Sequence, residues 1–196
     1  MTSYFSGTGS STVLVVILMA SACTESQAIE IFGESASPSG EVVVTWECAD
    51  ERDCRIDVRR NGTTSELFSE VPAPSVRWHS SSKGEVRVSC GDPCHYSVFV
   101  SREHTSRAFE LPIAVDIERS RVVVARNSTL KVFDIFNGEA PEHTESLDFS
   151  PSAAPATVIE SITILADGSL RVIYQRGPEF KLTEVIIDTG TQRSAE

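Results

Sequence analysis

Four cysteines fall into two matched segments, and the alternation of residue types around them constrains the fold more than any other feature of the chain. In residues 42–58 and again in residues 86–100, apolar side chains and cysteines recur at every second position on either side of a short polar turn. Residues two apart on a β-strand share one face of the sheet, so each segment predicts a β-hairpin with one apolar face. The cysteines on these faces are Cys48, Cys54, Cys90 and Cys94.

The opposite faces of the two hairpins are mostly polar, with Phe99 as the exception in the second hairpin. An antiparallel sheet that packs one face on a core and exposes the other shows this pattern. The spacing is also repeated, because 42 residues separate Cys48 from Cys90 and 40 residues separate Cys54 from Cys94. The two hairpins are therefore predicted to be copies of an internal repeat.

The facing of the cysteines predicts the disulfides Cys48–Cys54 and Cys90–Cys94, because the members of each pair point the same way across one turn. Loop entropy alone favours crossed pairing, since a bond closing some forty residues contributes about 4 kcal/mol against about 2 kcal/mol for each local bond. Crossed pairing, with each disulfide joining one hairpin to the other, is the alternative if the two hairpins are neighbours in one sheet. A zinc site built from the four thiolates is a further alternative, which the spacings and an oxidising compartment disfavour.

The rest of the chain also follows strand periodicity, and no window from Glu41 onward shows the 3.6-residue period of a helix. Asp167-Gly168 and Gly177-Pro178 mark turns. Residues 138–157 contain three prolines and are expected to form a long exposed loop. Further strands are expected at residues 113–118, 121–126 and 129–136, and at residues 162–165, 170–175 and 180–188.

The stretch LKVFDIFNGE at residues 130–139 contains an apolar-Asp pair, Phe133-Asp134, before a turn glycine. It resembles the closing strand of a β-propeller blade of the tryptophan-aspartate repeat class, over at most residues 113–190. The resemblance implies a propeller-like packing of meanders. The predicted fold class is all-β, with antiparallel hairpins and meanders in a small propeller-like or sandwich arrangement and two disulfide-closed hairpins. One domain is expected over residues 41–190, followed by a disordered tail at 191–196.

The N-terminal residues are typical of an export signal. The first twelve carry no charged side chain, and residues 13–19 are purely apolar. This run is shorter than the roughly 20 residues that cross a bilayer as a helix, and it ends in the small residues that a signal peptidase accepts. Residues 1–22 are therefore predicted to be a signal peptide. Residues 23–40 are expected to form a flexible tether, within which residues 28–32 fit a first edge strand.

Cys23 follows directly after the small residues of the leader. The stretch Met19–Cys23 resembles the lipobox of bacterial lipoproteins, which implies that Cys23 becomes a lipidated first residue. Cysteine parity supports this assignment, since setting Cys23 aside leaves four cysteines to pair. The protein is therefore expected in the periplasm as a membrane-anchored lipoprotein. If Cys23 is instead discarded with the leader, the protein is secreted.

The charge of the chain indicates which partners it favours. It carries 17 Lys and Arg against 28 Asp and Glu, a formal net charge of −11 at pH 7. Such a surface repels phosphate backbones and anionic headgroups, so no nucleic acid is expected as a partner and the membrane is contacted only through the lipid anchor. Another protein, basic in character, is the favoured partner, with simple solubility of an exported protein as the plainer explanation.

No arrangement of residues commits the chain to a chemistry. The sequence has no HExxH motif, no GxSxG elbow and no glycine-rich phosphate loop. No catalytic, cofactor-binding or metal-ligating residue is therefore expected, and no cofactor. Of the four histidines, His104 and His143 fall where turns or loops are expected and are read as solvated polar residues, and His79 and His95 belong to no metal-binding motif.

A polar loop between the short strand that ends at Trp78 and the second cysteine hairpin is the candidate binding loop, because loops of β scaffolds often carry recognition. It contains Ser80, Ser81, Ser82 and Lys83. The leading hypothesis is a non-enzymatic protein-binding module, with the immunity-type inhibitors of periplasmic cell-wall-degrading toxins and hydrolases as a class analogy. The alternatives are a structural envelope lipoprotein in a larger assembly and an envelope hydrolase whose site is not visible in the sequence.

Overall fold

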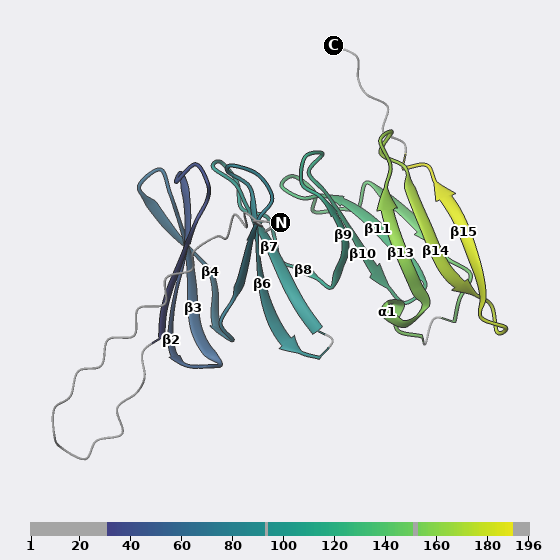
Figure 1. Cartoon of the computed structure of the whole chain (residues 1–196), viewed down its shortest axis with the longest axis horizontal. Coiled ribbons are helices and arrows are strands. Elements are labelled where there is room, and N and C mark those ends of the chain that lie inside the picture. Colours follow the sequence, from purple (N-terminus) through teal and green to yellow (C-terminus); the bar gives the residue numbers. More distant parts are fainter. Residues whose placement is uncertain (1–30, 93, 151–152, 190–196) are drawn as a thin grey trace, which may run out of the picture.

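The computed structural model describes residues 31–92, 94–150 and 153–189. These residues fold into fifteen β-strands and one short helix, and the strands form four antiparallel sheets that follow one another along the chain. We name them sheets A to D in chain order. Figure 1 shows the four sheets side by side in a row, with sheet A at one end and sheet D at the other. The all-β class and the antiparallel meanders predicted from the sequence are confirmed.

Each sheet is a meander in which neighbouring strands are also neighbours in sequence. Sheet A contains β1 to β4, sheet B β5 to β8, sheet C β9 to β12, and sheet D β13 to β15. The elements are β1 (Ile31–Ala36), β2 (Val42–Asp50), β3 (Asp53–Arg60), β4 (Thr63–Val71), β5 (Ser75–Trp78), β6 (Gly84–Gly91), β7 (Cys94–Val100), β8 (Phe109–Glu110), β9 (Pro112–Asp116), β10 (Arg121–Arg126), β11 (Thr129–Asp134), β12 (His143–Ser146), α1 (Pro155–Val158), β13 (Ile159–Ile164), β14 (Leu170–Arg176) and β15 (Lys181–Ile187).

Short turns keep consecutive strands adjacent. Asn61 and Gly62 form the two-residue connection between β3 and β4, with φ values of 50° and 75°. An Asn-Gly pair suits such a turn because both residues tolerate positive φ. Gly168, at φ 89°, lies in the turn before β14, where the sequence predicts one.

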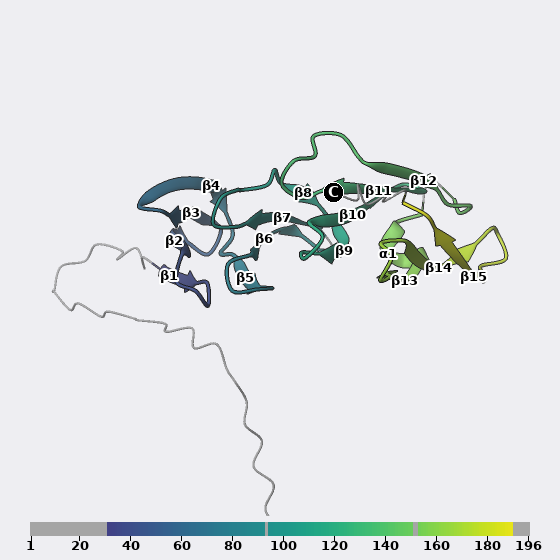
Figure 2. The same ribbon diagram turned by 90° about the horizontal axis from the view of Figure 1, so that it is seen from above.

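Three apolar clusters fill the spaces between the four sheets. Successive residues of a strand point to opposite faces, so neighbours such as Val98 and Phe99 on β7 belong to different clusters. Sheets B and C are therefore covered on both faces, whereas sheets A and D each have one face without a covering sheet (Figures 1 and 2). The clusters contain Val42, Val44, Ile56, Val58, Val86, Val88, Val98 and Val100 between A and B; Phe99, Phe109, Ile117, Val122, Phe133 and Ile135 between B and C; and Val123, Ala125, Leu130, Val132, Leu147, Phe149, Val158, Leu170, Val172, Tyr174 and Ile187 between C and D.

Both predicted disulfides are present, as Cys48–Cys54 and Cys90–Cys94. Each closes the hairpin formed by the second and third strands of its sheet, β2–β3 in sheet A and β6–β7 in sheet B. The internal repeat predicted from the cysteine spacing therefore corresponds to two successive sheets. Crossed pairing does not occur because the two hairpins lie in different sheets.

The structure corrects three expectations. The first strand, β1, lies inside the expected tether at 23–40, because its residues pair with β2. Residues 138–157 are not one exposed loop, since they contain β12 and bury Leu147 and Phe149 in the cluster between sheets C and D. Phe133-Asp134 ends the third strand of its sheet rather than the closing one, because β12 follows and pairs with β11.

The row of sheets is open at both ends in the part of the chain that the structure describes (Figure 2). A face-to-face stack is the arrangement observed, and the propeller-like alternative stays a prediction. No helix among the described residues is long and apolar enough to cross a membrane. The predicted signal peptide, the lipidation site Cys23 and the tail at 191–196 lie outside the described residues.

Candidate functional site

Sheet A has one face, at the N-terminal end of the row, that no other sheet of the described chain covers (Figure 1). Inward-pointing residues of β2 and β3 pack against sheet B, so the alternate residues of these strands point away from the molecule. The strand register brings these residues into two rungs across the sheet. The rungs are Phe32, Glu47 and Arg55, followed by Glu34, Thr45, Asp57 and Glu66.

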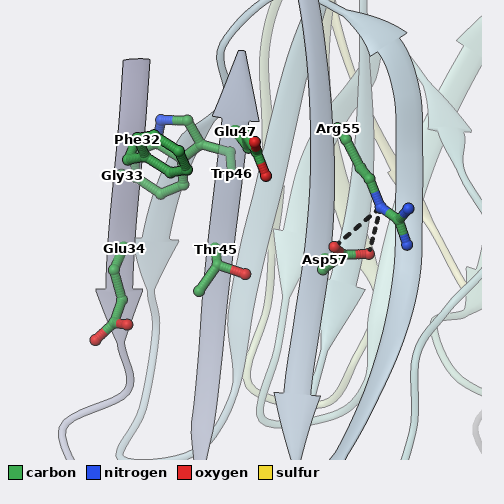
Figure 3. A pocket seen from close by; sticks show the side chains of 8 residues that line it. All are labelled: Phe32, Gly33, Glu34, Thr45, Trp46, Glu47, Arg55 and Asp57. Atoms are coloured by element: carbon green, nitrogen blue, oxygen red, sulfur yellow. Dashed lines mark hydrogen bonds and ion pairs between the residues drawn. The ribbon is translucent and has the colours of Figure 1, made fainter. Parts of the chain in front are cut away.

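A shallow depression of about 430 Å³ lies on this face. Figure 3 shows its lining side chains, which come from β1, β2 and β3. Phe32 is half-exposed at 51% and gives the depression an aromatic wall. The lining residues are Phe32, Gly33, Glu34, Thr45, Trp46, Glu47, Arg55 and Asp57.

Gly33 and Trp46 form the back of the depression. They are paired across β1 and β2, and a Cβ atom at position 33 would overlap the indole ring of Trp46. Only glycine therefore lets the ring lie flat against the β1 backbone. Trp46 also packs on the cluster between sheets A and B, so the indole connects the depression to the core.

The electrostatics of this face are acidic. Arg55 Nε lies 3.1 Å from Asp57 Oδ2 and 3.5 Å from Glu66 Oε2. The hydrogen bond and the charge of Asp57 raise the pKa of Arg55, and the charge of Glu66 adds to the effect. With Arg55 held in these pairs, the carboxylates of Glu34 and Glu47 are left facing solvent. Such a face attracts basic side chains, and an exposed aromatic ring adds a cation–π surface for Lys or Arg.

The predicted binding loop, Ser80 to Lys83, is held by its neighbours instead of extending as a free tip. Ser80 Oγ accepts hydrogen bonds from the backbone amides of Ser82 and Lys83 at 3.4 and 3.1 Å. The carbonyl of Ser81 accepts a bond from the amide of Ser39 in the turn between β1 and β2, and Lys83 Nζ donates to the carbonyl of Ile117 beyond β9. The loop therefore ties sheet B to both of its neighbours, with the side chains of Ser80 and Ser81 still exposed.

A buried polar cluster on the sheet C side of sheet B is the nearest approach to a catalytic constellation. Glu85, 3% exposed, accepts hydrogen bonds from Ser97 Oγ at 2.6 Å and from Arg87 Nη2 at 2.9 Å. Burial by itself would raise the pKa of Glu85, but these hydrogen bonds and the charges of Arg87 and His79 outweigh it, so its pKa is lowered. His79 Nε2 lies 3.5 Å from Glu85 Oε2, and this nitrogen has no hydrogen-bond partner among the described residues.

This order of contacts does not suit nucleophilic catalysis. A serine nucleophile needs a histidine as its base, with the carboxylate behind the histidine. Here the carboxylate of Glu85 lies between Ser97 and His79, and Ser97 is completely buried. The cluster therefore acts as a hydrogen-bond network within sheet B, on the face that sheet C covers. No group of histidine, cysteine and acidic residues in the described part of the chain has the geometry of a metal site.

Sequence reasoning identified part of the acidic face. The alternation around Cys48 and Cys54 places Glu47, Arg55 and Asp57 on the polar side of the hairpin, where the structure has them. Glu34 and Glu66 were not predicted, because they lie on the flanking strands β1 and β4, whereas Phe32 was expected at the end of the edge strand at residues 28–32. The Asn61-Gly62 turn after β3 was the available signal for β4, since it demands a following paired strand.

Neither a scan against models of known protein families nor a search of curated proteins finds a match.

Proposed function

We propose that this protein is an exported, non-enzymatic binding module that engages a basic protein through the uncovered face of sheet A. In this proposal residues 1–22 direct export, Cys23 carries a lipid anchor and the domain faces the periplasm. The partner is a cell-wall-degrading toxin or hydrolase, which the module inhibits in the manner of an immunity protein.

The observation that carries the proposal is the composition of the sheet A face. It combines an exposed phenylalanine with solvent-facing carboxylates on a surface that no other part of the described chain covers. Enzymes that act on anionic cell-wall polymers gain from a positively charged surface, and a protein of net charge −11 would be steered to such a surface. A partner laid across this face would exclude water from Phe32 while pairing Glu34 and Glu47.

The two disulfides support the export part of the proposal. Disulfides persist in oxidising compartments and are rare where thiols are kept reduced. One of the two, Cys48–Cys54, also braces the hairpin that presents the acidic face, because it closes β2–β3 directly beside that face.

The test is a binding and inhibition assay with matched charge variants. The chain from Cys23 onward is immobilised, a periplasmic extract of the source organism is passed over it, and any bound cell-wall hydrolase is purified and assayed for inhibition. The double variant Glu34→Lys and Glu47→Lys should reduce affinity by at least about tenfold. The control Glu103→Lys and Glu139→Lys has the same net charge and alters exposed carboxylates of sheets B and C, so it should bind nearly as the wild type does.

Two outcomes would count against the proposal. If both double variants lose binding equally, net charge and not the sheet A face governs the interaction. If no hydrolase is bound or inhibited, the immunity-type function is wrong.

A structural role in a larger envelope assembly is the second candidate. The observation that favours it lies at the opposite end of the row, where β15 exposes Leu182 at 60% and Ile186 at 57%. Exposed apolar side chains gathered on one strand are typical of a surface that another chain covers. Sedimentation of the solubilised native complex separates the two roles, because a structural component stays in a stable assembly without any hydrolase.

A further inference from the structure

In the part of the chain that the structure describes, sheet D has three strands where each of the other sheets has four. Sheets A, B and C end in β4, β8 and β12, each paired with the third strand of its sheet. In sheet D the third strand, β15, pairs with β14 and has no other strand beside it among the described residues. Its outer edge therefore presents backbone N–H and C=O groups in the direction in which the other sheets add a strand.

The residues of β15 differ from those of the outer strands elsewhere. Polar side chains dominate β4 and β12, the outer strands of sheets A and C, and such residues discourage edge-to-edge pairing. In contrast, β15 reads KLTEVII, with Leu182 and Ile186 exposed on its outer face. Three of the five large apolar side chains that are exposed in the described chain belong to β15 or the turn before it, the third being Phe180 at 68%.

A groove lies beside this edge. It encloses about 340 Å³ between the end of β12 and the end of β15. Leu147 and Tyr174, both members of the cluster between sheets C and D, form its floor together with Val185. Carboxylates of Glu145 and Asp188 stand at its rim. The groove thus offers apolar sites on the inner side of the place where a fourth strand would run.

We propose that β15 receives an antiparallel β-strand from a different polypeptide, which completes sheet D. Every second side chain of that strand is apolar and enters the groove, while the others lie beside Leu182 and Ile186 on the outer face. Strand addition of this kind draws affinity from main-chain hydrogen bonds and specificity from pockets for alternate side chains. The inference does not depend on the sheet A face.

Charge indicates that the incoming strand is basic and is not a second copy of this chain. Full antiparallel overlap of β15 with itself would centre on Glu184, whose carboxylate already pairs with Arg171 of β14 at 2.8 Å, so this contact offers a second copy no new charge pair. Each copy also has a net charge of −11, which opposes self-association. A strand with Lys or Arg instead complements this net charge and the rim carboxylates of Glu145 and Asp188.

The test uses a defined probe peptide and the full mature chain. The peptide KVTVKITVK alternates apolar and polar residues, and KTKVVIVTK has the same composition without the alternation. Fluorescence anisotropy should detect binding of the alternating peptide at least about tenfold tighter than binding of the scrambled one. Amide hydrogen exchange should slow in residues 181–187 on addition of the alternating peptide.

Variants locate the site. Ser146 is exposed at the rim of the groove, so Ser146→Trp fills the groove without disturbing the core and should weaken peptide binding about tenfold. The matched control, Ser65→Trp, places the same side chain at an exposed position of β4, the corresponding strand of sheet A, and should bind as the wild type does.

The proposal is overturned if the two peptides bind equally or if exchange slows outside β15. It is also overturned if the free protein already protects the amides of β15 as strongly as those of β14, since another segment of the same chain would then occupy the edge. Sedimentation as a dimer that β15 variants dissociate would assign the edge to a second copy instead.

Discussion

The hairpins β2–β3 and β6–β7 share a cysteine pattern but differ in what covers their polar faces. In sheet A that face is open, with Arg59 exposed, whereas in sheet B the corresponding residue is Phe99, which is completely buried against sheet C. Asp57 likewise corresponds to Ser97, which is also completely buried. Burial of the second face therefore depends on the place of the hairpin in the row. Where another sheet covers that face, an apolar or small residue replaces the charged one.

The disulfides differ in the opposite way, because the cysteines of sheet A are buried whereas Cys90 of sheet B is exposed. Cys48 and Cys54 have no exposed surface, because their hairpin lays them on the cluster between sheets A and B. Cys90 is exposed. Two disulfides of similar loop length therefore lie in different surroundings, and their removal should have different consequences.

Alanine substitution of Phe99 in sheet B and of Arg59, the corresponding residue of sheet A, should give the largest difference in the free energy of unfolding between the two hairpins. Phe99→Ala removes a buried ring that lies 6.0 Å from the ring of Phe109, and it should lower the free energy of unfolding by about 3–5 kcal/mol. Arg59→Ala should change it by less than about 0.5 kcal/mol, because Arg59 is exposed. Urea denaturation followed by tryptophan fluorescence measures both. Similar losses for the two variants would show that sheet C does not cover sheet B in solution.

Removal of one disulfide or the other should give a smaller difference in stability between the two hairpins. Each bond closes a short loop and should contribute about 2 kcal/mol. Replacement of Cys48 and Cys54 by serine also buries two hydroxyl groups in an apolar cluster, which adds about 1–3 kcal/mol to the loss, whereas replacement of Cys90 and Cys94 does not. Thermal unfolding of the two double variants tests this order. An equal decrease in Tm would mean that loop closure alone sets both contributions.

The smallest difference in the free energy of unfolding should come from removing the charge of Glu85 or of Glu47, and it should depend on pH. The pKa of Glu85 is lowered in the fold, so its ionised form stabilises the native state above the unfolded-chain pKa of about 4.3, and that contribution is lost as the pH falls through the folded pKa. Glu85→Gln should therefore lower the free energy of unfolding by about 1–2 kcal/mol at pH 7, and by progressively less below pH 4. Glu47→Gln, on the exposed face of sheet A, should show almost no change. If Glu85→Gln lowered the free energy of unfolding by the same amount at every pH, ionisation of Glu85 would not be the cause of the loss.

Most of the secondary structure was predictable from local sequence pattern. The hairpins around the cysteines, the strands of sheets C and D and the turns at Gly168 and Gly177 follow from alternation and turn chemistry, which act between residues close in sequence. Both disulfides were predictable for the same reason, because each joins cysteines across one turn. The short strands β8 and β12 were not predicted, since they have two and four residues and too few positions to show a period, and β4 was not predicted although it has nine residues.

The candidate face was predictable only where it lies on the cysteine hairpin. Glu47, Arg55 and Asp57 are placed outward by alternation alone. Phe32 joins them through β1, whose six residues lie in a stretch that composition assigns to a tether. Pairing with β2 overrides that local preference, because the β1 backbone exchanges hydrogen bonds to water for hydrogen bonds to β2, and Gly33 lets the ring of Trp46 pack against it.

The sequence by itself determined that this protein is an all-β chain of antiparallel hairpins with two local disulfides and an acidic surface. Only the tertiary structure decided which faces are covered. Glu85 and Ser97 have the pattern of a solvated strand face, and they are buried because a sheet formed later in the chain packs over them. Leu182 and Ile186 alternate like core residues, and they are exposed because no further sheet or fourth strand follows in the described chain. Alternation specifies that a strand has two different faces, but contacts between sheets distant in sequence specify what each face meets.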